Sequence, residues 1–175
     1  MNPTPANLMV AVCDQAVCVR INGRADFTCS VDLKKLILEL WQRGYRRFIF
    51  ELRDCAMMDS TFLGMLSGIG LKFCDGANPR ESPLELSNPN ARIAEVLENL
   101  GVAHLFRITS GAEPLTDHFE PLAKAGGESR AEITRACLEA HKTLMEIKPE
   151  NVRKFKDVAQ FLAEDLKRLE AAEKK

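Results

Sequence analysis

The sequence predicts an α/β domain with a mixed β-sheet, followed by an α-helical extension at the C-terminus. Short apolar runs alternate with amphipathic segments of helical length in the first part of the chain. A stretch rich in glycine and proline follows, and heptad-like apolar repeats continue from there to the end. We therefore expect the domain in residues 1–111, a linker in 112–129 and a helical extension in 130–175.

Two strands and a helix are predicted at the start of the domain. Residues 8–13 and 16–22 are rich in β-forming side chains and flank a short polar turn. In the second run every other residue is a branched apolar one, which predicts one buried face: Val17, Val19 and Ile21. Ser30 can cap an amphipathic helix that Gly44 ends.

The most informative stretch follows as a strand, a turn and a helix start. Residues 48–52 form a nearly continuous apolar run, which is typical of a central strand buried on both faces between helices. We expect residues 53–58 to form a loop. Asp59, Ser60 and Thr61 then offer side chains that accept hydrogen bonds from the free N–H groups of a helix beginning there.

The helix after Ser60 carries one apolar stripe and several glycines. Its large apolar residues recur at spacings of four, three and four, which predicts a core-facing stripe of Phe62, Leu66, Ile69 and Phe73. Gly64, Gly68 and Gly70 cost this helix roughly 3 kcal/mol of helix propensity in total. Close approach of the helix backbone to the sheet is the simplest explanation for them.

The domain is predicted to close with two more strands and one more helix. Residues 84–86 form a short apolar run, and Asn88 or Asn90 can cap the helix that Gly101 ends. Residues 105–108 form a last short strand.

The C-terminal extension carries two narrow apolar seams, and Pro149 separates them. They consist of Ile133, Cys137, Ala140, Leu144 and Ile147, and of Val152, Phe155, Ala159, Leu162, Leu166 and Leu169. A hairpin of two helices and one kinked helix are both compatible with this pattern. The seams need a cover, which is either the parent domain or a helix of a second chain or of a partner.

Composition argues against several classes of function. The formal net charge of −1 gives no global attraction to nucleic acid or to an anionic membrane surface, and no apolar run is long enough to insert into a membrane. Six scattered cysteines without a CxxC pair are typical of a reduced, cytoplasmic protein. We expect neither a metal site nor a cofactor, because the chain lacks a metal motif, a phosphate loop and a dinucleotide fingerprint.

The segment FELRDCAM followed by MDSTFLGML resembles the signature of STAS domains, the module of bacterial anti-sigma factor antagonists. The matching positions are Asp59, Ser60, Leu63 and Gly64. Thr61 stands where a second serine is common, and Phe62 stands where glycine is common. The segment VRINGRADF is similar to the second strand and following turn of that family, through Gly23 and Asp26.

This resemblance implies a protein that regulates transcription by binding an anti-sigma factor, which is itself a serine kinase, or a related kinase. The acceptor serine of the family corresponds to Ser60, with Thr61 as the runner-up, and phosphorylation would end the binding. The residues expected to contact the partner are Arg24, Asp26, Asp59, Ser60, Thr61 and Phe62.

Physical chemistry supports a switch at this place. A phosphate at a helix N-terminus is stabilised by free N–H groups and by the helix dipole. On Ser60 it would add a charge of about −1.5 to −2 next to Asp59, which would repel a surface built for a neutral hydroxyl. The plain alternative is that both side chains only cap the helix, for about 1 kcal/mol. Phe62 either turns inward or enlarges the binding surface.

Other functions remain open at this point. The chain could be a constitutive scaffold that dimerises through residues 130–175, or a STAS subunit of a lipid-transport complex. An enzyme is not expected, because Ser60 lacks a GxSxG context and neither His104 nor His118 has a spacing that implies a catalytic triad.

Overall fold

The computed structural model of the chain describes residues 7–74, 78–124 and 126–174. Residues 1–6 and Lys175, which the predicted boundaries include, lie outside the described residues. The strands are β1 (Asn7–Cys13), β2 (Ala16–Ala25), β3 (Arg47–Glu51), β4 (Cys55–Met58), β5 (Leu84–Ser87), β6 (Arg107–Thr109) and β7 (Glu120–Pro121). The helices are α1 (Phe27–Gln42), α2 (Ser60–Phe73), α3 (Ala91–Leu100), α4 (Arg130–Ile147) and α5 (Asn151–Glu173), with short 3-10 turns at Pro79–Glu81 and Ala103–Leu105.

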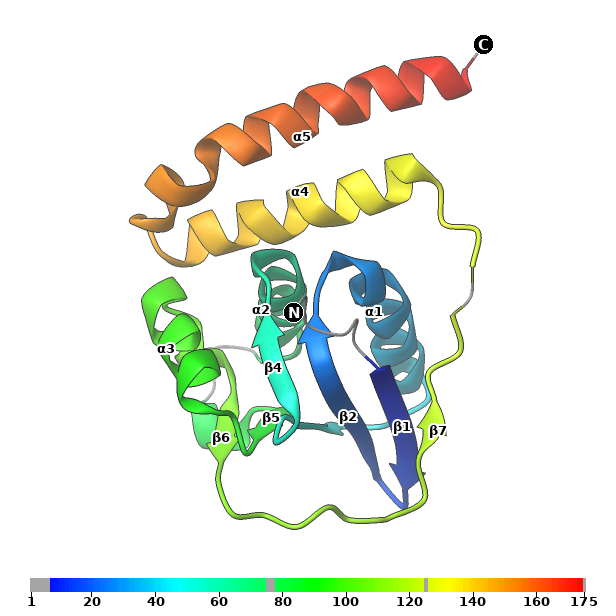
Figure 1. The fold of residues 1–175 in the computed structure, drawn as a ribbon, viewed down its shortest axis with the longest axis vertical. Helices are drawn as coiled ribbons and strands as arrows, with labels where there is room; N and C mark the ends of the chain where they lie inside the picture. The colour runs from blue at the N-terminus through cyan, green and yellow to red at the C-terminus, as the bar shows by residue number, and fades with distance from the viewer. Residues whose placement is uncertain (1–6, 75–77, 125, 175) are drawn as a thin grey trace.

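The strands form one mixed sheet in the order β6-β5-β3-β2-β1-β7, and β4 pairs with the end of β2 (Figure 1). Neighbours are parallel from β2 through β3 and β5 to β6, whereas β1 runs antiparallel to β2 and to β7. The predicted central strand is confirmed, because β3 lies inside the sheet with Phe48 and Phe50 fully buried. The α/β class with a mixed sheet is therefore confirmed.

The main core lies between the sheet and the helices α1, α2 and α3. The alternating residues of β2 point into it, as predicted, together with the stripe of α2. The opposite face of the sheet buries a small cluster of Ala11, Ala16, Cys18 and Ile49, against which Phe119 packs. β3 is thus buried on both faces, but by helices on one side and by the connecting segment on the other.

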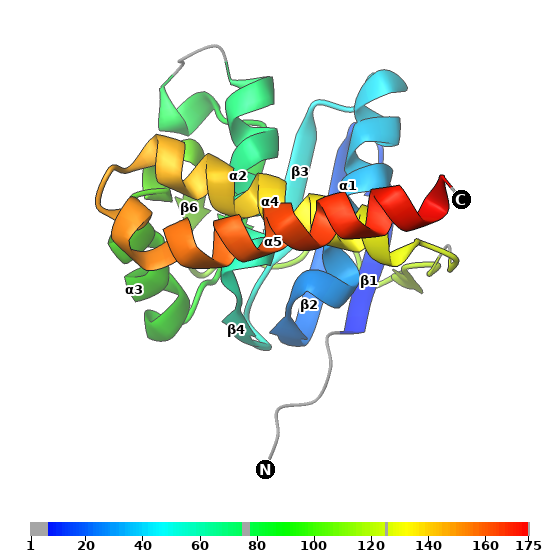
Figure 2. The ribbon, with the colours of Figure 1, turned by 90° about the horizontal axis from the view of Figure 1, so that it is seen from above.

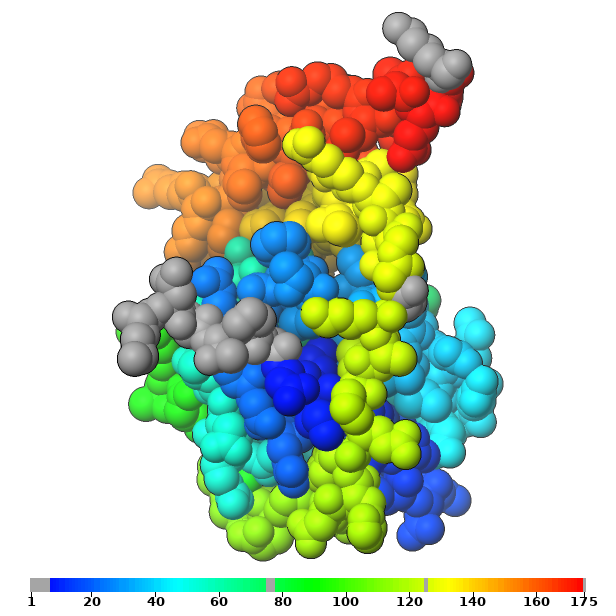
Figure 3. Space-filling view, turned by 45° about the vertical axis from the view of Figure 1, so that its right-hand side comes forward, coloured from blue at the N-terminus to red at the C-terminus, as the bar shows by residue number. Residues whose placement is uncertain are grey.

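The segment between the domain and the C-terminal helices runs over the surface of the sheet. It adds the edge strand β7, whose Glu120 and Pro121 pair with Val10 and Met9 of β1. In the space-filling view this segment, in yellow-green, runs alongside the blue N-terminal strands and leads up to α4 (Figure 3). The connection therefore brings the start of α4 to the side of the molecule where α1 and α2 lie.

The C-terminal extension forms a hairpin that adds a third layer. α4 lies on α2 and also contacts α1, and α5 packs along the outer side of α4. Figure 2 shows both helices running side by side across the molecule above α2 and α1. In this structure the parent domain covers α4, and α4 in turn covers the inner side of α5.

Local structure differs from the expectation at three places. α1 begins at Phe27 with Asp26 as its N-cap, and the Ser30 hydroxyl instead donates to the Asp26 carbonyl at 3.0 Å. Residues 55–58 form a strand rather than a loop, because they pair with the end of β2. The last strand of the predicted domain lies at 107–109, after a 3-10 turn at 103–105.

Candidate functional site

Helices α1 and α2 begin side by side because the strands that precede them pair. Ala25 at the end of β2 is the register partner of Met58 at the end of β4, and the Asp59 N–H donates to the Ala25 carbonyl at 2.9 Å. The Asp59 carboxylate then accepts from the N–H of Phe62 at 2.8 Å and from the N–H of Phe27 at 3.1 Å. One carboxylate therefore caps α2 and ties it to the start of α1.

Asp26 and Arg24 lie next to this capping residue. Asp26 caps α1 by accepting from the Thr28 N–H at 3.0 Å, and Arg24 Nε lies 3.6 Å from its carboxylate. Burial raises the pKa of the Asp59 carboxyl, although the hydrogen bonds from Phe62 and Phe27 oppose the shift. The fold thus brings together the predicted site residues Arg24, Asp26, Asp59 and Ser60 at the adjoining ends of β2 and β4.

Ser60, the first residue of α2, is half-buried and is hydrogen-bonded to a histidine of α4. Its Oγ lies 2.9 Å from His141 Nε2, and His141 Nδ1 lies 2.7 Å from the Cys137 carbonyl. A carbonyl oxygen only accepts hydrogen bonds, so Nδ1 carries a proton. In the neutral ring, Nε2 therefore accepts a hydrogen bond from the Ser60 hydroxyl.

His141 is itself enclosed by the C-terminal hairpin. Its side chain is buried, and its ring centre lies 5.1 Å from that of Phe155 in α5. Both helices of the extension therefore hold the imidazole against Ser60.

The two residues after Ser60 point away from solvent. Thr61 is buried against α4, where its side chain interacts with the Cys137 thiol. Phe62 is fully buried in the main core, where a partner protein cannot reach it. Of the two orientations considered for Phe62, the structure has the inward one.

One of the three glycines of α2, Gly64, explains how α4 approaches so closely. A Cβ atom on Gly64 would lie 2.4 Å from the Ala140 carbonyl oxygen and 2.7 Å from its carbonyl carbon. A Cβ on Gly68 would meet Thr143 at 3.7 Å, and one on Gly70 would meet Leu105 at 3.4 Å. The expectation that all three glycines face the sheet is wrong for Gly64 and Gly68, which face α4.

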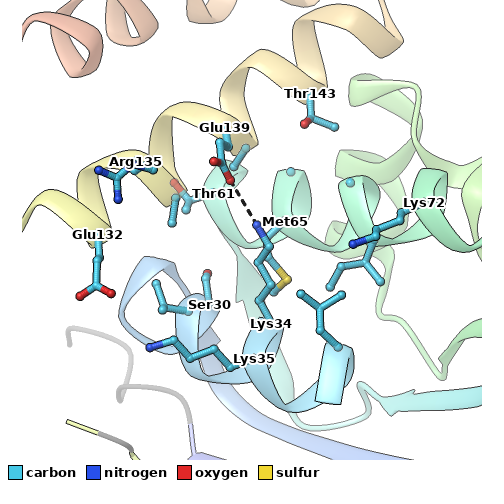
Figure 4. Close-up of a pocket in the computed structure, with 17 residues that line it drawn as sticks. Ser30, Lys34, Lys35, Thr61, Met65, Lys72, Glu132, Arg135, Glu139 and Thr143 are labelled. Atoms are coloured by element: carbon cyan, nitrogen blue, oxygen red, sulfur yellow. Dashed lines mark hydrogen bonds and ion pairs between the residues drawn. The ribbon is translucent and has the colours of Figure 1, made fainter. Parts of the chain in front are cut away.

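A pocket of about 420 Å³ opens between α1, α2 and α4, next to Thr61 (Figure 4). Basic and acidic side chains line it, and Lys34 of α1 is paired with Glu139 of α4 at 3.2 Å. Ser60 and His141 do not line this pocket. α4 therefore packs tightly at Gly64 and loosely beside it.

A serine hydroxyl bonded to an imidazole is also the geometry of an activated nucleophile. Here the second ring nitrogen faces a main-chain carbonyl instead of a carboxylate, and the hydroxyl faces the helix interface instead of the pocket. Among the residues described, no three His, Cys, Asp or Glu side chains are grouped so that they could hold a metal ion.

His141 is the site residue that reasoning from the sequence missed. It follows Cys137 by four residues and precedes Leu144 by three, so it shares the buried face of its helix. A histidine on an apolar seam was the available signal. It did not indicate Ser60 as the partner, because the two residues are 81 positions apart in the sequence.

No curated protein is significantly similar to the chain in sequence. Among solved structures, the anti-sigma factor antagonist SpoIIAA in its unphosphorylated form aligns with 61% of this chain and 89% of its own, at 18% identity and a TM-score of 0.51. An anti-sigma factor antagonist from Mycobacterium paratuberculosis aligns with 60% of this chain and 86% of its own, at 14% identity and a TM-score of 0.50. At these identities the likeness establishes the fold alone.

No helix within the described ranges is both long and apolar enough to cross a membrane. The family model for the STAS domain matches residues 7–115. This range includes the helix start at Ser60 and every strand of the sheet except β7. Asp59 and Ser60, which belong to the segment that resembles the family signature, lie where β4 ends and α2 begins. The chain therefore belongs to the STAS domain family.

Proposed function

We propose that this protein is an anti-sigma factor antagonist-like regulator, which binds a serine-kinase anti-sigma factor or a related kinase and is switched by phosphorylation of Ser60. One observation carries the proposal. Ser60 is the first residue of α2 and follows its N-cap Asp59, at the junction with the start of α1. A hydroxyl there sits next to free helix N–H groups that favour a phosphate.

The surroundings of Ser60 give the switch its physical cause. Phosphorylation adds a charge of about −1.5 to −2 beside the carboxylates of Asp59 and Asp26, which are already close together. Arg24 is engaged with Asp26 at 3.6 Å. A partner surface that accommodates a neutral hydroxyl and two carboxylates would meet strong repulsion after modification, and binding would end.

The site residues support a regulator better than a catalyst. Ser60 lies at a helix interface, and the fold is shared with two anti-sigma factor antagonists. We assign the partner contacts to Arg24, Asp26, Asp59, Ser60 and Thr61, and we place the protein in the bacterial cytoplasm, where the partner kinase acts.

Phosphosite mass spectrometry tests the acceptor. The protein is isolated from its native host with phosphatases inhibited, alongside Ser60→Ala and Thr61→Val variants expressed at the same level. We expect one phosphate on Ser60, absent from Ser60→Ala and retained in Thr61→Val. A phosphate on Thr61 alone, or none under any growth condition, would reject Ser60 as the switch.

A Ser60→Asp variant then separates a switch from a constitutive scaffold. Pull-down from the native host with wild-type protein should capture a serine kinase, and the same experiment with Ser60→Asp should lose it. Equal capture by both proteins would favour a scaffold, and capture of a membrane ATPase would favour a subunit of a lipid-transport complex.

A further inference from the structure

The C-terminal hairpin covers the surface on which the proposed function depends. Ser60 Oγ is bonded to His141, Thr61 is buried under α4, and the backbone of α4 touches Gly64. While α4 is in place, the Ser60 hydroxyl is half-buried and engaged by His141, so α4 occupies one side of the approach to it.

With the Ser60 side chain oriented toward His141, as it is in this structure, a phosphate on Ser60 would collide with the docked α4. The hydroxyl oxygen is 2.9 Å from His141 Nε2, which is a direct hydrogen-bond distance. A phosphoryl group would place a phosphorus atom and three further oxygens in that gap. α4 has no slack there, because even a Cβ atom on Gly64 would overlap the Ala140 carbonyl.

The interface under α4 has the character of a separable contact between two units. Among the buried residues of α4, only Leu144 belongs to the main core of the domain, and the partly buried Ile147 of α4 and Phe155 of α5 pack against that core. The other contacts include a buried histidine, the exposed ion pairs Lys34–Glu139 and Lys35–Glu128, and a pocket that leaves α1 and α2 partly uncovered. Interfaces that mix ion pairs and polar groups with a few apolar contacts permit movement between units.

The way α4 sits also shows what kind of element fits this surface. The first turns of α2 accept a helix that places a small residue over Gly64 and a hydrogen-bonding side chain opposite Ser60. In this chain Ala140 and His141 supply these two features. Two consecutive residues of α4 therefore contact two positions one turn apart on α2: Ala140 packs on Gly64, and His141 bonds to Ser60.

From this we infer that the face of α2 bearing Ser60 is a helix-docking surface, that α4 is its resident occupant, and that a partner helix competes with α4 for it. The inference deepens the proposed function and rests on it for the identity of the competitor. In the closed form the protein binds its own α4; in the open form the hairpin is released, and Ser60 is available to a partner helix or to phosphorylation.

Hydrogen–deuterium exchange on the full chain tests whether a modified Ser60 and a docked α4 exclude each other. Ser60→Ala removes one hydrogen bond and adds no bulk, whereas Ser60→Glu adds bulk and charge in the gap. We expect the amides of α4 to exchange at least tenfold faster in Ser60→Glu than in Ser60→Ala, with β2 and β3 unchanged. Equal protection of α4 in both variants would overturn the inference.

A second measurement, of the chemical accessibility of position 60, introduces no charge into α2. It therefore tests the inference even if Ser60→Glu perturbs the sheet. Ser60→Cys provides a thiol whose labelling by a maleimide, resolved by peptide mass spectrometry, reports access to position 60. Adding Ala140→Leu should displace α4 and raise the labelling rate at least tenfold, while the matched change Ala172→Leu on an exposed part of α5 should not. Equal rates would show that α4 does not guard Ser60.

The preference for a helix is tested with a fluorescent peptide of residues 128–174 added in trans. It should bind the Ala140→Leu chain at least tenfold more tightly than the wild-type chain, whose surface is occupied. Equal binding to both, or no binding to the opened chain, would overturn the helix-docking surface. These experiments use no kinase, so their failure refutes the hairpin inference alone, whereas the absence of a Ser60 phosphate in cells refutes the proposed function alone.

Discussion

A matched pair of glycine substitutions in α2 tests the packing of α4 most directly. Gly64 and Gly68 lie one helical turn apart, and both face α4. Replacing either glycine with alanine gives α2 the same gain in helix propensity, about 1 kcal/mol. The difference between the two variants therefore isolates the contact with α4.

The expected difference follows from the space at each position. At Gly64 the new methyl group would lie 2.4 to 2.8 Å from three atoms of Ala140, two of which belong to the backbone, so α4 must move. At Gly68 the nearest atoms are at 3.7 and 3.9 Å, which is ordinary contact with Thr143. Overpacking of this kind costs roughly 1–3 kcal/mol, so Gly64→Ala should be less stable than Gly68→Ala by that amount.

Urea denaturation followed by two probes measures the effect. Fluorescence of Trp41, the single tryptophan, reports on the domain core beside Phe73, and far-UV circular dichroism reports on all the helices. For Gly64→Ala we expect helical signal to be lost at lower urea concentrations than the fluorescence change. Coincident curves at the same stability as Gly68→Ala would refute the close packing of α4 on α2.

Three further predictions concern other parts of the structure. Asp59→Ala should lower the free energy of unfolding by about 1–2 kcal/mol, because two helix N–H groups lose their acceptor; chemical denaturation against wild type measures this. Burial raises the pKa of the Cys29 and Cys55 thiols to about 11, so at pH 8 both should react with iodoacetamide roughly a hundredfold more slowly than in urea, by peptide mass spectrometry. Asn151 is fully buried and donates to two main-chain carbonyls at 2.8 and 2.9 Å, so Asn151→Asp should cost roughly 3 kcal/mol and speed amide exchange in the hairpin, whereas unchanged exchange would contradict this.

The fold of the domain was predictable because its signals are local. The alternation in β2, the apolar run of β3 and the stripe of α2 each follow from residues within one element. The start of α1 was misplaced, because Ser30 and Asp26 are both capping residues and the sequence does not say which one the chain uses. β4 was missed because its formation depends on pairing with the end of β2, which is a nonlocal event.

Only the part of the site that depends on local sequence was predictable. The Asp59 cap and the position of Ser60 follow from residues adjacent in sequence, and the structure has both. The two apolar seams of the extension indicate that α4 and α5 need a cover, but they carry no information about which surface supplies it. The expected contact of Gly64 with the sheet is instead a contact with Ala140 of α4, which lies far away in the sequence and has no local signal.

The strength of the contact under α4 decides whether it can act in a switch. A hairpin docked 99% of the time is held by about 2.7 kcal/mol, and it lowers the apparent affinity of a competitor about a hundredfold. One hydrogen bond such as Ser60–His141 contributes about 1 kcal/mol, and one buried leucine such as Leu144 contributes about 1.5–3 kcal/mol, before the cost of ordering the hairpin. For the inferred switch to work, the charge and bulk of a phosphate on Ser60 must offset contributions of this size. A contact much more apolar than this one would keep Ser60 covered permanently, and a much weaker one would leave it exposed at all times.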